Sequence, residues 1–122
     1  MRFLKLAVLV FVLGSSFAHA DSAWIRKVLG SEIIVDSSAY GQCMVRFSAD
    51  VDVQSYLPLC RPGHITFDCG AELPGSTRIN SLEKFDVAKT AIALGRKISL
   101  LITDDQTIDG FCLARQIRIH KQ

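Results

Sequence analysis

Alternating hydrophobic and polar positions predict two short strands in the middle of the chain, at residues 43–47 and 65–69. The apolar faces consist of Cys43, Val45 and Phe47 in the first and of Ile65, Phe67 and Cys69 in the second. A period of two residues is typical of a strand whose two faces meet different surroundings. We therefore expect both segments to turn one face toward a core.

Three longer runs rich in β-forming residues flank these two segments. They are Trp24 to Asp36, Lys97 to Thr103 and Phe111 to His120. The first run is interrupted by Gly30, and a glycine inside a long strand suits a bulge or a sharp bend. The sequence thus predicts one long bent strand near the start and two regular strands near the end.

A helix is predicted from Ser81 to Leu94. Asn80 is a suitable N-cap, and Glu83, three residues later, completes a capping box. The apolar stripe consists of Leu82, Phe85, Ala88, Ala91 and Ile92, at helical spacing. Gly95 stands where a left-handed C-cap residue belongs.

The resulting order is a bent strand, two strands, a helix and two further strands. Five strands with a helix between the third and fourth is the order of an OB-fold, a small and partly open Greek-key barrel. The sequence therefore predicts a mainly β domain of the α+β class with an OB-fold-like barrel. The alternative is another α+β arrangement, such as a sheet with a helix packed on one face.

The first twenty residues have the pattern of a secretory signal peptide. Two cations lie within the first five residues, an apolar run spans Leu6 to Leu13, and Ala18 to Ala20 offers a small-x-small cleavage site before Asp21. The apolar run is shorter than the ~20 residues that span a bilayer, so membrane insertion is not expected. We expect one domain over residues 21–122, exported to the periplasm or secreted.

Export changes the charge balance. The chain has 14 Lys+Arg and 12 Asp+Glu, and two of the cations lie in the expected leader. The remaining domain is formally neutral, which disfavours nucleic acid as a partner because phosphate binding relies on a basic excess.

All four cysteines, Cys43, Cys60, Cys69 and Cys112, lie in the exported part. An even number in a small exported domain predicts two disulfides, and four cysteines allow three pairings. In the expected barrel, pairing Val45 with Phe67 across a hairpin places Cys43 opposite Cys69. This favours Cys43–Cys69 and Cys60–Cys112.

The segment from Phe85 to Asp104 (FDVAKTAIALGRKISLLITD), with Cys112 after it and LCRPGHITFD before it, resembles OB-fold B subunits of the subtilase cytotoxin and of pertussis-like toxins. The resemblance extends from about Glu32 to Ile119. It implies a non-catalytic OB-fold that binds cell-surface glycans, often as a homo-oligomer. The toxin subunits use a serine near the start of the first strand, which makes Ser31, Ser37 and Ser38 candidate ligand-binding residues, although none matches the toxin motif residue by residue.

Other side chains suggest further chemistry. Tyr40 and Tyr56 lie in predicted loops, where such barrels contact oligosaccharides, and are added to the candidate ligand-binding residues. His64, oriented by Asp68 or Asp36, has the chemistry of a general base, but we interpret it as a strand-edge histidine. The carboxylates Asp104, Asp105 and Asp109 suit calcium chemically, but we interpret them as a polar turn because the spacing of an EF-hand is missing.

Three functions are compatible with these observations. The preferred hypothesis is a non-catalytic binding domain for a cell-surface glycan, without a cofactor or a metal. The alternative is a small envelope or secreted inhibitor, or another interaction protein acting on an enzyme, in which Arg61 to His64 enters a cleft. The least favoured is a hydrolase that uses His64 and a serine.

Overall fold

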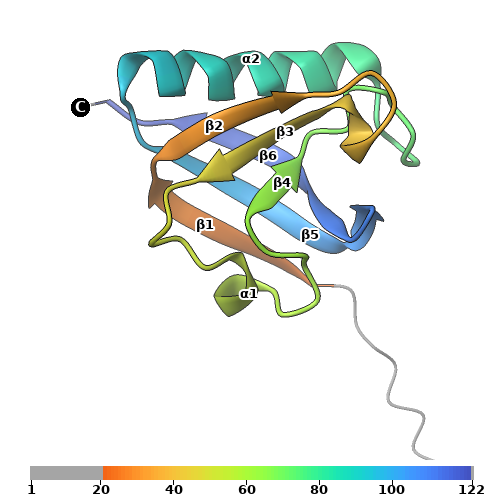
Figure 1. Ribbon diagram of the computed structural model, residues 1–122, viewed down its shortest axis with the longest axis horizontal. Coiled ribbons are helices and arrows are strands. Elements are labelled where there is room, and N and C mark those ends of the chain that lie inside the picture. The colour runs from red at the N-terminus through yellow and green to blue at the C-terminus, as the bar shows by residue number, and fades with distance from the viewer. Residues whose placement is uncertain (1–20, 122) are drawn as a thin grey trace, which may run out of the picture.

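The computed structural model describes residues 21–121, which form one six-stranded sheet with a long helix along one side (Figure 1). The strands are β1 (Ser22–Val28), β2 (Gly30–Val35), β3 (Cys43–Phe47), β4 (His64–Thr66), β5 (Ile98–Ile108) and β6 (Phe111–Ile119). The helices are the 3-10 turn η1 (Tyr40–Gln42), the short α1 (Val53–Tyr56) and the long α2 (Arg78–Leu94). The expected leader, residues 1–20, lies outside the described residues.

The strand order is β1-β5-β6-β4-β3-β2. The neighbours are antiparallel except β4 and β6, which run parallel with Thr66 beside Leu113. The strands at the two ends of this order, β1 and β2, are consecutive in sequence and separated only by Leu29. The two edges of the sheet therefore approach each other at this residue.

The prediction of five strands is wrong, because the first predicted strand is two strands. β1 pairs with β5 and β2 pairs with β3, with register shifts on both sides of Leu29. Gly30 permits this change of direction close to α2, since a Cβ at Gly30 would lie 2.8 Å from Cγ1 of Ile92. The predicted bend at Gly30 thus marks the place where the chain moves from one strand partner to another.

Helix α2 lies between β4 and β5, as predicted, but it begins before Ser81. The N-cap is Thr77 rather than Asn80, and the Thr77 hydroxyl accepts a hydrogen bond of 3.3 Å from the backbone N–H of Asn80. Threonine caps a helix by the same chemistry as asparagine, and Thr77 begins the helix three residues before the predicted cap. The predicted end is confirmed, since Gly95 adopts the left-handed conformation with φ of 63°.

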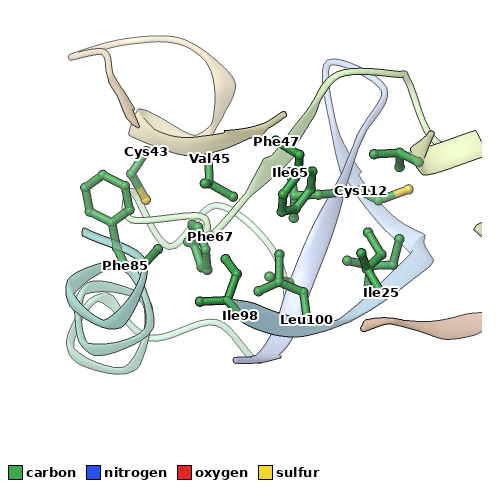
Figure 2. Packing of buried hydrophobic residues seen from close by; sticks show 14 of the residues in the cluster. Ile25, Cys43, Val45, Phe47, Ile65, Phe67, Phe85, Ile98, Leu100 and Cys112 are labelled. Carbon is green, nitrogen blue, oxygen red and sulfur yellow. The ribbon is translucent and has the colours of Figure 1, made fainter. Parts of the chain in front are cut away.

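The core lies between α2 and the inner face of the sheet (Figure 2). Phe85 of α2 packs against Phe67, with ring centroids 5.8 Å apart. Ile65, Ile98 and Leu100 are fully buried beside these rings. The alternation predicted in residues 43–47 holds only in part, because Cys43, Val45 and Phe47 join the core but Met44 between them is buried as well.

Both predicted disulfides are present. The Cα atoms are 5.7 Å apart in Cys43–Cys69 and 5.3 Å apart in Cys60–Cys112. The register used to predict the first bridge is wrong, because Val45 pairs with Ile65 rather than with Phe67. Cys69 still reaches Cys43 because the chain leaves strand geometry at Asp68, where φ is 56°.

Candidate functional site

Four side chains from three segments of the chain meet at one end of β6, and we call them the Phe111 cluster: Tyr40, Arg61, His64 and Phe111. The ring of Phe111 is buried, and the rings of Tyr40 and His64 stand edge-on to it at centroid distances of 5.7 Å and 5.6 Å. The guanidinium of Arg61 lies 4.5 Å from the Phe111 ring centroid. Arg61 is exposed, and Tyr40 and His64 are half-buried, so the cluster presents a phenol, an imidazole and a guanidinium to solvent.

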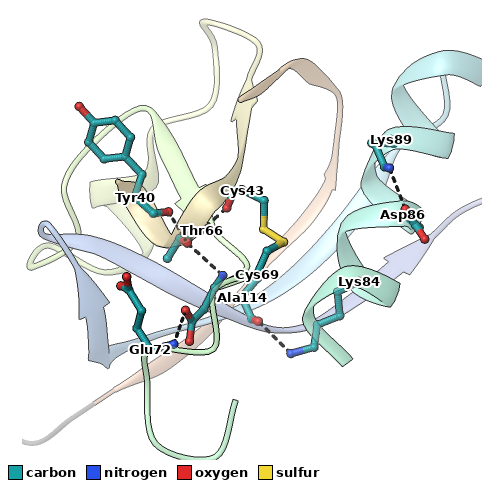
Figure 3. The surroundings of a disulfide bond; sticks show 10 residues. Tyr40, Cys43, Thr66, Cys69, Glu72, Lys84, Asp86, Lys89 and Ala114 are labelled. Atoms are coloured by element: carbon teal, nitrogen blue, oxygen red, sulfur yellow. Dashed lines mark hydrogen bonds and ion pairs between the residues drawn. A yellow bond between two sulfur atoms is a disulfide. The ribbon is translucent and has the colours of Figure 1, made fainter. Parts of the chain in front are cut away.

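Tyr40 is held in an unusual backbone conformation. Tyr40, Gly41 and Gln42 have φ values of 60°, 70° and 72°, in the left-handed region that non-glycine residues rarely adopt. The Tyr40 N–H donates to Oδ2 of Asp109 at 3.3 Å, and the Tyr40 carbonyl accepts from the Thr66 hydroxyl at 2.8 Å. Figure 3 shows the Tyr40 ring projecting away from this attachment, with its hydroxyl outermost.

Gly41 allows the loop to lie this close to the sheet. A Cβ at this position would be 2.5 Å from Oγ1 of Thr66 and 2.8 Å from Cδ1 of Ile108. Both neighbours are side chains of strands, so neither can move far without disturbing the sheet. Glycine at this position therefore sets the position of Tyr40 above Thr66.

Arg61 is fixed from the other side of the cluster. Its backbone N–H donates to the Gly110 carbonyl at 2.8 Å, and its Nη1 donates to the Asp109 carbonyl at 3.3 Å. The disulfide Cys60–Cys112 joins the residues next to Arg61 and Phe111. One covalent bond and two hydrogen bonds thus hold the segment before β4 against the turn between β5 and β6.

A polar row continues from the cluster across the outer side of the sheet. Glu32 of β2 pairs with Arg46 of β3, and Arg46 pairs with His64 of β4. Burial lowers the pKa of His64, the charges of Arg46 and Arg61 lower it further, and Glu32 opposes them. An imidazole with a lowered pKa is neutral at pH 7, so His64 can both donate and accept a hydrogen bond.

The structure brings Ser37, Ser38 and Tyr40 together in the loop between β2 and β3. The Asp36 carboxylate accepts hydrogen bonds from the N–H groups of Ser38 and Ala39 and from the Ser38 hydroxyl. These bonds lower the pKa of Asp36, the two backbone bonds most. Ser38 is thereby engaged in the turn, whereas Ser37 lines a small hollow of about 260 Å3 that faces α2.

Ser31 and Tyr56 lie apart from this loop. The Ser31 hydroxyl donates to the Phe47 carbonyl at 3.0 Å, at the opposite end of β2. Tyr56 ends α1, which contacts β1, whereas η1 with Tyr40 contacts β3 and β4. Of the five residues predicted to bind a ligand, three therefore share one loop and two do not.

Arg61 and Phe111 were missing from the predicted ligand-binding residues. Each directly adjoins a cysteine of the predicted Cys60–Cys112 bridge. That pairing brings Arg61 and Phe111 close together. The predicted disulfide was therefore the sequence feature from which their proximity could have been inferred.

The carboxylates considered as partners of His64 are engaged elsewhere. Asp68 is buried and accepts from the N–H groups of Glu72 and Leu73, each at 2.9 Å. Asp36 accepts from the Ser38 turn described above. His64 itself contacts the Phe111 ring. His64 thus belongs to an aromatic cluster, and the two carboxylates expected to orient it bind backbone groups elsewhere.

The interpretation of Asp104, Asp105 and Asp109 as a polar turn is correct only for Asp109, because Asp104 and Asp105 belong to strand β5. The three carboxylates act as separate acceptors. Asp104 accepts from the Asp21 N–H at 2.7 Å, Asp105 accepts from the Thr103 hydroxyl, and Asp109 accepts from the Tyr40 N–H. Within residues 21–121, no three His, Cys, Asp or Glu side chains gather as ligands for a metal ion.

A larger groove of about 580 Å3 lies where α2 begins. Its charged lining consists of Glu83, Lys84, Asp105 and Arg115. The Lys84 ammonium donates to the Ala114 carbonyl at 3.3 Å, and its pKa is lowered by burial and by the charge of Arg115. Because two carboxylates face two cations, the groove has no clear preference for ligand charge.

Comparisons of the chain with protein-family models, with curated proteins and with solved structures find no match. Over residues 21–121, no helix has the length and apolar character needed to cross a membrane. The most distinctive feature of the described surface is the Phe111 cluster, where three loops or strands present polar groups around one ring.

Proposed function

We propose that this protein is an exported, non-catalytic domain that binds a carbohydrate through the Phe111 cluster. The observation that carries the proposal is the convergence of Tyr40, Arg61 and His64 on one buried aromatic ring. Hydrogen bonds and a disulfide hold these groups in place before any ligand arrives. Such preorganisation lowers the entropy cost of binding.

We further propose that the sheet is an OB-fold-type barrel. If β1 and β2 are the two halves of one bent strand, the strand order and the parallel pair β4–β6 follow that topology. OB-folds bind ligands on the face of the second and third strands and on the loops after the first strand and before the fifth. These positions correspond here to β3, β4, the loop 36–42 and the β5–β6 turn, and the Phe111 cluster lies where they meet.

The chemistry of the cluster suits a sugar. A sugar ring has an apolar C–H face and a rim of hydroxyl groups, and tyrosine has an apolar body with a polar tip. Arg61 supplies donors, and neutral His64 supplies a donor and an acceptor. Next to them, Glu32 and Arg46 carry opposite charges in neighbouring strands. This combination favours a neutral or weakly charged glycan.

Export and the resemblance to toxin B subunits support the same proposal. Two disulfides are consistent with an oxidising compartment outside the cytoplasm, where glycans of other cells are accessible. The resemblance also leads us to propose that the protein assembles as a homo-oligomer and has a partner subunit, as toxin B subunits do. Several weak sites in one oligomer would together bind a glycan surface more tightly than one site alone.

The test is a glycan array probed with the full chain, expressed for export so that its disulfides form. We expect binding to a defined set of glycans, with Tyr40→Ala reducing the affinity for them at least tenfold. Tyr56→Ala is the control, because it removes the same side chain from an exposed position outside the cluster and leaves binding unchanged. Absence of any array signal, or equal losses in the two variants, would contradict the proposal.

A second candidate function is inhibition of an enzyme by the loop before β4. Arg61 and Pro62 are exposed, and the space around Gly63 is open. The loop is also anchored through Cys60–Cys112 and the Arg61–Gly110 hydrogen bond, and a rigid protruding loop can enter a cleft without a large entropy cost. A stoichiometric enzyme partner captured from envelope extract, inhibited by the protein and released by Arg61→Ala, would favour this function over glycan binding.

A further inference from the structure

A groove of about 460 Å3 opens at the end of the sheet where β1 and β6 finish and β5 begins. We call it the lysine groove; its lining consists of Lys27, Leu29, Gly95, Lys97, His120 and Lys121. Three of these six residues are lysines, and no carboxylate is among the described residues that line it. None of the six belongs to the Phe111 cluster, so the groove is a separate surface.

The strand register places three lysines at the same end of the sheet. Val28, Ile98 and Ile119 are neighbours across β1, β5 and β6, so Lys27, Lys97 and Lys121 extend from the same end of the sheet. At the other end of β1 and β5, Ser22 pairs with Thr103, and the Asp104 N–H donates to the Asp21 carbonyl. A chain that is formally neutral beyond residue 20 thus has a locally positive end.

The groove is held together by a buried serine. The Ser99 hydroxyl oxygen accepts from the Lys27 N–H at 3.0 Å and lies 2.7 Å from Nε2 of His120. The His120 N–H also donates to the Lys97 carbonyl at 2.9 Å. These bonds join the segments that carry Lys27, Lys97 and Lys121, so the positions of the three lysine backbones are coupled.

Lys27 occupies a strained position in this arrangement. It lies in a bulge between Ile25 and Val28, where the pairing of β1 with β5 shifts, and its φ is 51°. A bulge changes the direction of a side chain, and a left-handed lysine costs free energy that an ordinary strand would avoid. This strained conformation adds a third lysine to the groove, although like charges repel each other. An anionic ligand bound in the groove would offset that repulsion.

We infer that the lysine groove is a second binding site, which takes a saccharide carrying sulfate or phosphate groups. Lysine ammonium groups bind tetrahedral oxyanions as point charges, and three of them favour a ligand with at least two such groups. The volume is within the range of ~300–1,000 Å3 for small-ligand sites. Leu29, which is 42% exposed, offers an apolar contact to the C–H face of a sugar.

The shape of the groove separates this ligand from other polyanions. Nucleic acids are bound by neutralising many phosphates along an extended surface, and membranes by clusters of four to eight cations. A concave site with three lysines and one exposed leucine has too few cations for a nucleic acid or a membrane surface. It suits a ligand of one or two sugar units. The inference about the lysine groove does not depend on the proposal that the Phe111 cluster binds a glycan.

The test uses isothermal titration of the oxidised full chain with defined probes. Sucrose octasulfate represents sulfated saccharides, fructose 1,6-bisphosphate represents phosphorylated ones, and sucrose is the uncharged control. We expect at least one charged probe to bind and sucrose not to bind. Because asparagine tolerates a left-handed backbone, the double variant Lys27→Asn/Lys97→Gln removes two charges without new strain and should weaken binding at least tenfold.

Lys89→Gln is the matched control. Lys89 lies on the exposed side of α2 in an ion pair with Asp86, outside the groove, so its loss leaves binding within twofold of the original. Binding of either charged probe, with no binding of sucrose, supports the inference. The inference is overturned if neither probe binds, if the double variant binds as tightly as Lys89→Gln, or if duplex DNA or vesicles of anionic phospholipid bind more tightly than both saccharides. Tyr40→Ala leaves this binding unchanged, so failure here is distinguishable from failure of the Phe111 cluster.

Discussion

The hydroxyl of Thr66 donates a hydrogen bond of 2.8 Å to the carbonyl oxygen of Tyr40, 26 residues earlier in the chain. The same hydroxyl oxygen accepts from the Asp68 N–H at 3.1 Å and lies 3.3 Å from the Cys43 carbonyl oxygen. Thr66 is fully buried, so water cannot replace these bonds. A core residue that faces no solvent thus sets the position of the tyrosine proposed to meet the ligand.

Replacing Thr66 by valine should therefore destabilise the protein and loosen the loop 36–42. Loss of the Thr66 hydroxyl leaves the Tyr40 carbonyl and the Asp68 N–H without their partner. We expect this to lower the free energy of unfolding by about 1–3 kcal/mol. Thr66→Ser keeps the hydroxyl and should retain most of this stability. Urea denaturation of the three proteins measures the difference, and equal midpoints for the valine and serine variants would show that the hydroxyl contributes little.

Gly41→Ala should be more damaging than Gly63→Ala, although both glycines have positive φ values of 70° and 94°. At Gly41 the added Cβ meets Thr66 Oγ1 at 2.5 Å, whereas at Gly63 nothing lies within 4 Å. We expect a loss of about 3 kcal/mol for Gly41→Ala from strain and overpacking together, and of about 1 kcal/mol for Gly63→Ala from backbone strain alone. Thermal unfolding of both variants checks the ranking, which similar losses would refute.

The titration of His64 should appear in the pH dependence of stability. Burial and the nearby arginines lower its pKa in the folded protein below the ordinary value of 6.5, so the unfolded chain takes up the proton first as pH falls. The contribution to stability is present above pH 6.5 and is lost as pH falls through the folded pKa. Nuclear magnetic resonance of the imidazole gives that pKa, and His64→Gln should remove this part of the pH dependence. A pKa above 6.5 would contradict the environment described for His64.

Removing the disulfide Cys60–Cys112 should affect both stability and the Phe111 cluster. Chain-entropy reasoning gives a loss of about 4 kcal/mol for this bridge, compared with about 3.5 kcal/mol for Cys43–Cys69, because it closes the longer loop, with a sequence separation of 52 rather than 26. Double alanine variants measured by urea denaturation test the two values.

The two disulfide variants also differ in their expected effect on binding. Loss of Cys60–Cys112 frees the segment that carries Arg61 and should reduce carbohydrate affinity even where the protein is folded. Loss of Cys43–Cys69 leaves the hydrogen bond between Arg61 and Gly110 in place and should change affinity less. The reverse order would show that the bridge beside Arg61 does not position the cluster.

Much of the fold was predictable because it follows from local patterns. The alternation around Val45 identified β3, and Gly95 identified the end of α2. Both disulfides were predicted, Cys60–Cys112 from the expected order of strands and Cys43–Cys69 from a hairpin register that is wrong by two residues. The division of the first strand at Leu29 was not predictable, because it depends on which partner each half finds across the sheet.

The candidate site was predictable only in part. Ser37, Ser38 and Tyr40 were among the predicted ligand-binding residues, and they share the loop between β2 and β3. The left-handed backbone of Tyr40 had no sequence signal, because tyrosine rarely adopts it and the conformation depends on the hydrogen bond with Thr66. Aspartate adopts it more readily, so Asp68 offered a weak signal, which the predicted strand over residues 65–69 did not use. The register error of two residues between β3 and β4 has the same origin, because the chain turns at Asp68 before the predicted strand ends.

The most direct test of the central proposal is to map the bound glycan on the protein by nuclear magnetic resonance. The full chain, labelled with 15N and oxidised, is titrated with the glycan that gives the strongest array signal. The proposal predicts that the largest chemical-shift changes occur in the backbone amides of Tyr40, Arg61, His64 and Phe111 and their sequence neighbours. Largest changes around Tyr56 or around the lysine groove, with the amides of the Phe111 cluster unmoved, would contradict it.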